Sequence, residues 1–186
     1  MTSASPNRVT VIGCTVTGIS IALALVRTGT EVTLEDRDPA ALDRALHAGA
    51  GLPLTPGHPP AHVVIIATAP GDTVDTLVEA QARGLGHTYT DIHGTSPAVR
   101  AEAELRGCDQ GGYLPGHPLT GRDRPAGPDA HLLTGRTWIL CPYDTTTAET
   151  ETTVTALVTA CGARPRRLAP TAPGHTSGPD RLSIPS

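Results

Sequence analysis

The chain has 186 residues, a formal net charge of -4, 2% aromatic residues and no phenylalanine. This length suits one domain with a hydrophobic core of its own. A chain without a basic surplus, and without aromatic side chains for base stacking, is not expected to bind nucleic acid, and no apolar run reaches the length of a membrane span.

The first thirty residues change from the pattern of a strand to that of a helix across a glycine turn. Residues 9–12 are apolar and mostly β-branched, as in a buried parallel strand. From residue 18 to residue 26 the apolar side chains recur at helical spacing. A strand, a glycine turn and a helix in this order are typical of the start of a dinucleotide-binding βαβ unit.

The turn holds a degenerate form of the three-glycine fingerprint. Gly13 and Gly18 occupy its first and third positions, and Thr15 stands at the second, where a Cβ narrows the space for a phosphate. The start of the following helix offers free amides and a partial positive charge. We therefore expect Gly13, Cys14, Thr15, Val16 and Gly18 to bind the pyrophosphate of a cofactor.

Residues 31–36 are expected to form a second strand that ends in an acid. Asp36 lies about 20 residues past the fingerprint, where a carboxylate accepts the ribose hydroxyls of the adenosine. This carboxylate favours NAD, but Arg37 could stack on the adenine or pair with a 2′-phosphate, so NADP stays open. The alternative interpretation is a purely structural glycine turn followed by a solvated acid.

Strand and helix patterns then alternate to the end of the chain. We expect strands at 62–68, 88–92, 137–141 and 164–168, helices at 39–48, 72–83, 97–106 and 145–161, a surface connection at 52–61, and irregular structure at 107–135. This alternation predicts a Rossmann-type, doubly wound α/β fold with a mostly parallel sheet. Residues 1–168 would form one dinucleotide-binding domain, and residues 169–186 a disordered tail.

In such a sheet the ligand crevice lies at the carboxyl ends of the strands. That edge would collect the glycine turn, Asp36, Thr68, residues 91–96 and residues 116–122. The cysteines at 14, 108, 141 and 161 form no C-x-x-C pair, so no metal site is indicated, and free thiols in the cytoplasm are expected.

A succession of motifs resembles the prephenate and arogenate dehydrogenases. In order, these are V-I-G-x-x-x-x-G at 11–18, L-E-D-R-D-P at 34–39, V-V-I-I-A at 63–67, G-H-P-L-T-G at 116–121 and W-I-L-C-P at 138–142. The resemblance covers residues 8–168 and implies NAD(P)-dependent oxidation of the ring hydroxyl of prephenate or arogenate. Carbon dioxide is lost as the ring becomes aromatic, a reaction of tyrosine biosynthesis.

The resemblance also implies roles for particular residues. His117 matches the family's catalytic histidine, and an imidazole suits a proton acceptor at neutral pH; without the resemblance it would be interpreted as a histidine of a polar loop. Arg122 follows the same motif and could bind the anionic substrate. Gly94 stands where the family has a serine, and Ser96 replaces a lysine and is expected to contact substrate. His93 is an additional imidazole without an assigned role.

Members of the family continue into a helical domain that dimerises, so a homodimer is implied, but this chain ends in Pro-, Gly- and Ser-rich sequence where that domain is expected. Two alternatives therefore stay open. One is a non-catalytic nucleotide-binding remnant of the family, and the other is a different nicotinamide enzyme of related architecture.

Overall fold

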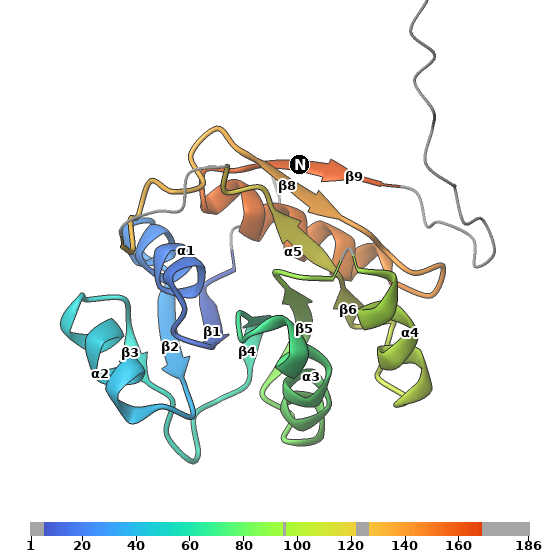
Figure 1. Cartoon of the computed structure of the whole chain (residues 1–186), viewed down its shortest axis with the longest axis horizontal. Coiled ribbons are helices and arrows are strands. Elements are labelled where there is room, and N and C mark those ends of the chain that lie inside the picture. Colours follow the sequence, from blue (N-terminus) through green and yellow to red (C-terminus); the bar gives the residue numbers. More distant parts are fainter. Residues whose placement is uncertain (1–5, 95, 122–126, 169–186) are drawn as a thin grey trace, which may run out of the picture.

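The computed structural model describes residues 6–94, 96–121 and 127–168. Its strands form a six-stranded parallel sheet in the order β3-β2-β1-β4-β5-β6 and a three-stranded sheet in the order β7-β8-β9 (Figure 1). The strands are β1 Arg8–Ile12, β2 Glu31–Glu35, β3 Leu52–Pro53, β4 Ala61–Ile66, β5 Gly86–Asp91, β6 Tyr113–Leu114, β7 Gly116–Pro118, β8 Thr137–Leu140 and β9 Arg164–Arg167.

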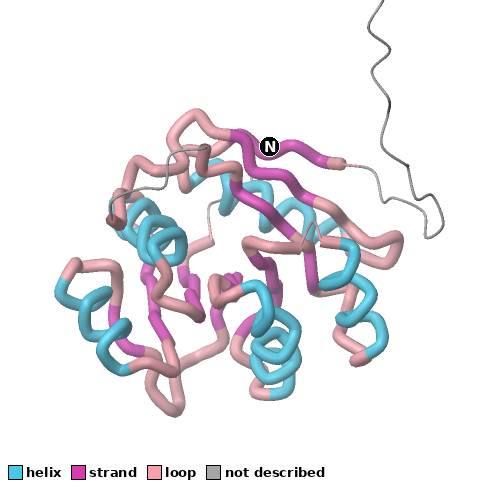
Figure 2. Tube along the Cα trace, viewed as in Figure 1, coloured by secondary structure: helices cyan, strands magenta, loops and turns pink. Residues whose placement is uncertain are grey.

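Helices cover both faces of the larger sheet (Figure 2). They are α1 Val16–Arg27, α2 Pro39–His47, α3 Thr73–Ala82, α4 Pro97–Leu105 and α5 Ala148–Ala160, with a short 3₁₀ helix, η1, at Pro70–Asp72. The predicted Rossmann-type, doubly wound α/β fold is therefore confirmed. It brings the carboxyl ends of β1, β2, β4 and β5 to one edge, because parallel strands all end on the same side.

The central strand β4 divides the core into two layers. Val63 and Ile65 belong to the cluster that contains side chains of α1 and α5, and Val64 and Ile66 to the cluster under α3 and α4. All four side chains are fully buried. Because successive side chains of a strand point to opposite faces, an uninterrupted apolar run is what a strand with two covered faces requires.

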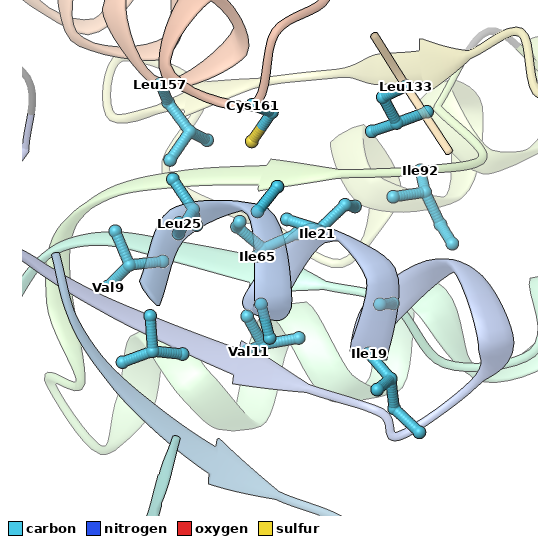
Figure 3. Close-up of a cluster of buried hydrophobic side chains, with 14 of the residues drawn as sticks. Val9, Val11, Ile19, Ile21, Leu25, Ile65, Ile92, Leu133, Leu157 and Cys161 are labelled. Carbon is cyan, nitrogen blue, oxygen red and sulfur yellow. The ribbon is translucent and has the colours of Figure 1, made fainter. Parts of the chain in front are cut away.

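The larger cluster fixes α1, and hence the glycine turn before it, against the sheet. Ile21 and Leu25 of α1 are fully buried near Val9 and Val11 of β1, and Leu157 of α5 closes the cluster from above (Figure 3). Burial of one such side chain contributes about 1.5–3 kcal/mol. The start of α1 is thus held by a rigid core.

Side-chain caps fix the starts of two helices. Asp38 caps α2 by accepting a hydrogen bond from the amide of Ala40, and Pro39 occupies the first helical position. Helix α5 begins later than predicted, because the hydroxyl of Thr147 accepts from the amide of Thr150 and makes Thr147 the N-cap.

The predictions of a mere connection at 52–61 and of irregular structure at 107–135 were incomplete. The first segment contributes the edge strand β3, which has two exposed residues, one of them a proline, and so no alternating pattern. The second contributes β6 and β7, with Pro115 between them. Strand β7 pairs antiparallel with β8, and β8 pairs parallel with β9, which makes a second sheet.

All four cysteines are free and buried. Within the described residues, no helix combines the length and the apolar character that a membrane crossing needs. The predicted tail at 169–186 lies outside the described residues, and the domain boundary at residue 168 stays a prediction.

Candidate cofactor and active site

The glycine turn at the start of α1 has no room for side chains at its first and last glycines. A Cβ on Gly13, which has a φ of +105°, would lie 2.5 Å from the carbonyl carbon of Ala67, and one on Gly18 would lie 2.3 Å from the carbonyl oxygen of Gly13. The turn therefore packs directly on the end of β4, as a dinucleotide-binding turn must.

Thr15, at the degenerate second position, is the N-cap of α1. Its hydroxyl accepts from the amide of Gly18 at 3.1 Å and donates to the carbonyl of Ala67 at 3.0 Å. The side chain thus serves the turn itself. The amides of Val16 and Thr17 lie in the first helical turn, where no intrahelical acceptor exists, and they are the donors that a phosphate would use.

Asp36 follows β2 and is bound to the same turn. One carboxylate oxygen accepts from the amide of Cys14 at 2.6 Å, and the other accepts from the amide of Asp38 at 2.8 Å. These two hydrogen bonds fix the carboxylate of Asp36 at the sheet edge and leave lone pairs for ribose hydroxyls. Burial, with the nearby Asp36 charge, raises the pKa of the Cys14 thiol to about 11, so the thiol stays protonated at neutral pH.

A cavity of about 190 Å³ opens between the turn, the end of β2 and α3. The hydroxyl of Thr68 is buried there and has no hydrogen-bond partner among the described residues. Free helix amides and a close-packed glycine turn followed by an acid after β2 are the features of a dinucleotide-binding site, so the residues present fit such a cofactor. The predicted residues that line this cavity are Gly13, Thr15, Asp36, Arg37 and Thr68.

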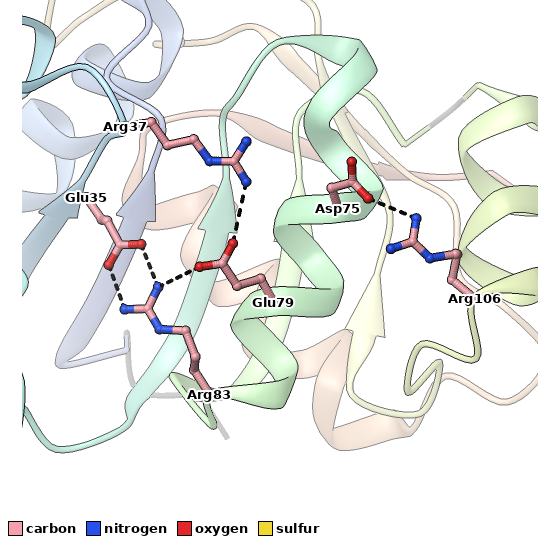
Figure 4. A network of polar contacts seen from close by, with 6 residues as sticks. All are labelled: Glu35, Arg37, Asp75, Glu79, Arg83 and Arg106. Atoms are coloured by element: carbon pink, nitrogen blue, oxygen red, sulfur yellow. Dashed lines mark hydrogen bonds and ion pairs between the residues drawn. The ribbon is translucent and has the colours of Figure 1, made fainter.

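The other predicted cofactor residues do not line this cavity. Cys14 and Gly18 are buried in the turn, and Val16 is partly exposed at the start of α1. The lining of the cavity also includes the charged residues Glu35, Glu79 and Arg83, which were not predicted as site residues (Figure 4). The sequence did contain one indication of them: Glu79 and Arg83 are four residues apart on the helix after β4, a spacing that predicts an ion pair.

A second cavity, of about 550 Å³, lies next to the first and shares the loop after β4 with it. Pro70 and Gly71 line it from one side and the first two turns of α4 from the other, and it contains His93, Ser96 and His117. The structure therefore places His117 and Ser96 together. Arg122 lies outside the described residues.

His117 is oriented by a backbone carbonyl. Its Nδ1 lies 2.9 Å from the carbonyl oxygen of Ile92. A carbonyl oxygen only accepts, so Nδ1 carries a proton, and in the neutral form of the ring Nε2 is the acceptor. This tautomer is the one that a proton acceptor at Nε2 needs.

His93 joins the two cavities. Its Nε2 donates to the carbonyl oxygen of Thr68 at 3.1 Å, while its ring lines the same cavity as His117. Burial is the main cause that lowers the pKa of His93. The imidazole is therefore neutral at neutral pH and connects the end of β4 to the loop after β5.

Asp91, the last residue of β5, holds the strand that carries His117. Its fully buried carboxylate accepts from the hydroxyl of Tyr113, the amide of Gly116 and the amide of His93, at 2.9–3.1 Å. A Cβ on Gly94 would lie 2.3 Å from Asp91 Oδ1. A serine at position 94, as the family resemblance would have it, therefore needs this carboxylate to move.

Asp91 should make stability depend on pH. Burial raises the pKa of its carboxyl from 3.8 to about 6, so between these values the folded chain holds a proton that the unfolded chain has lost. The stabilisation by the protonated form is complete below about pH 4 and is lost as the pH rises through about 6, roughly 3 kcal/mol in all. Urea unfolding of the unaltered chain and of Asp91→Asn from pH 4 to 7 measures this fall in the free energy of unfolding. If the free energy of unfolding depended on pH in the same way in both chains, the prediction would be wrong.

Among the described residues, no group of three or more His, Cys, Asp or Glu side chains is arranged to hold a metal ion.

Comparison with known proteins identifies the family. The family model of the prephenate dehydrogenase nucleotide-binding domain matches residues 21–166. This range covers more than half of the chain, which therefore belongs to that family. The match begins within α1, after the glycine turn.

Individual relatives agree with this assignment. NovF of Streptomyces niveus, a probable prephenate dehydrogenase, is 36% identical over 159 residues, which are 83% of this chain and 43% of that protein. The structure of Aquifex aeolicus prephenate dehydrogenase in complex with hydroxyphenyl propionate and NAD+ is 20% identical, with a TM-score of 0.77 over 90% of this chain and 62% of that one. Synechocystis arogenate dehydrogenase is 18% identical, with a TM-score of 0.74 over 88% and 60%.

The two solved structures show the shared fold. The chain spans less than half the length of the curated relative and about three fifths of the two solved chains.

Proposed function

We propose that the chain binds NAD and acts in the oxidative decarboxylation of prephenate or arogenate, with His117 as the proton acceptor. One observation carries the proposal: His117 Nδ1 donates to the carbonyl of Ile92, so that in the neutral ring Nε2 is the proton acceptor, beside a cavity that adjoins the nucleotide site. The proposal is supported by the related structures, which are those of an arogenate dehydrogenase and of a prephenate dehydrogenase in complex with NAD+.

In this proposal each cavity has one task. The glycine turn and Asp36 hold the cofactor, and the nicotinamide supplies the hydride acceptor. His117 Nε2 takes the proton of the substrate hydroxyl, which favours departure of the hydride as the oxygen gains negative charge. Ser96 is the N-cap of α4, and among the described residues its side chain makes no capping bond, which supports a role for its hydroxyl in substrate binding.

The test is NADH formation by the full chain with prephenate, and separately with arogenate, at saturating NAD. Turnover with either substrate supports the proposal. Nucleotide binding without turnover at substrate saturation would select a non-catalytic member of the family, and turnover only with hydroxyacid or pyrroline substrates would select a different nicotinamide enzyme.

We also propose a cytoplasmic location, because four free cysteines suit a reducing compartment. A homodimer stays a prediction from the family resemblance.

A further inference from the structure

The nucleotide cavity is lined by more acidic than basic side chains. Its charged residues carry a formal charge of -2 among the described residues, with four carboxylates against two guanidinium groups. The acids are Glu35, Asp36, Asp72 and Glu79, and the bases are Arg37 and Arg83.

Both arginines are already paired with carboxylates. The two terminal nitrogens of Arg83 face the two oxygens of Glu35 at 2.7 and 2.8 Å, a fork-to-fork geometry. This hydrogen bonding also raises the pKa of Arg83. Arg83 is therefore held by an acid that precedes it by 48 residues in the sequence.

Glu79 is shared between the two arginines. One of its oxygens lies 3.4 Å from Arg83 Nη1, and the other lies 3.4 Å from Arg37 Nη2 (Figure 4). Arg37 directly follows Asp36, the residue expected to bind the ribose. An arginine at this place is the usual partner of a 2′-phosphate, and here it faces an acid instead.

We propose that Glu79 determines the cofactor specificity of this site: it holds Arg37 and adds a negative charge, and so selects a nucleotide without a 2′-phosphate. The inference rests on the proposed NAD site. Because the Arg37–Glu79 pair is largely exposed, its contribution to stability is small. Its effect should therefore appear in the ratio of two affinities, while the folded state persists.

The experiment is calorimetric titration of the full chain with NAD+ and NADP+, and with AMP and adenosine 2′,5′-bisphosphate as fragments, at low ionic strength. In Glu79→Gln the affinity for the 2′-phosphorylated ligands should rise about fivefold, the size expected for one exposed charge. The affinity for NAD+ and AMP should change less than about twofold. The double variant Glu79→Gln with Arg37→Ala should keep only the part of the gain that comes from removing the negative charge, because the released guanidinium is then absent.

Asp75→Asn is the matched control. Asp75 is also on α3 and is also paired with an arginine, Arg106 at 2.8 Å, but it does not line the cavity (Figure 4). An unchanged affinity ratio in Glu79→Gln, or an equal change in Asp75→Asn, would overturn the inference even though NAD+ binds. If the unaltered chain binds neither nucleotide, the proposed function itself fails at its cofactor site.

Discussion

Replacing His117 with asparagine should lower the rate of prephenate-dependent NADH formation by about 10²–10⁴-fold, the usual contribution of a positioned proton acceptor. Asparagine can still donate its amide N–H to the carbonyl of Ile92, which now accepts from His117 Nδ1. It has no nitrogen that can take a proton. The loss should therefore be in kcat, since the substrate hydroxyl would keep its proton as hydride leaves.

Nucleotide affinity distinguishes this loss from general damage. His117 does not line the smaller cavity, so the Kd for NAD should be the same in the variant and the unaltered chain. Activity within about threefold of the unaltered chain would remove His117 from the mechanism, and a large rise in the Kd for NAD would show that the substitution disturbs the glycine turn instead.

Gly13→Ala should lower the free energy of unfolding by roughly 2–5 kcal/mol, the combined size of left-handed backbone strain and an overpacked contact. The new methyl group would meet backbone atoms of Ala67 and Thr68 at 2.5–2.6 Å, and the φ of +105° is one that side chains rarely allow. Backbone atoms cannot turn aside as a flexible side chain can, so the turn must move off β4. Because its amides would be displaced as well, nucleotide binding should be lost together with stability.

Urea unfolding and calorimetric titration with NAD test this prediction, and Gly71→Ala is the control. Gly71 lies in η1, where a Cβ meets no atom within 4 Å and φ is outside the left-handed region. It should therefore behave like the unaltered chain in both assays. A Gly13→Ala variant of full stability and normal affinity would show that the turn is looser than its geometry indicates.

Much of the fold could be predicted from the local pattern of apolar residues and glycines. The apolar run before Gly13 and the helical spacing after Gly18 each depend on neighbours within a few residues, so the first strand, turn and helix could be predicted directly. The motif around His117 pointed to the family that the comparison then identified. The short strands β3, β6 and β7 were not predicted, because a segment of two or three residues is too short to show a hydrophobic periodicity.

The pairing of side chains at the site depends on contacts between segments that are far apart in the sequence. Cys14 and Asp36 are 22 residues apart, Ile92 and His117 are 25 apart, and Glu35 and Arg83 are 48 apart. Such contacts set the tautomer of His117 and the hydrogen bonds that the buried Asp91 accepts. They also place Glu79 between two arginines. The local pattern of strands, turns and helices was enough to predict which chemical groups reach the sheet edge. Which of these groups pair there follows from the strand order β3-β2-β1-β4-β5-β6, because this order sets which strand ends become neighbours, and hydrogen bonds and ion pairs form only over a few ångströms.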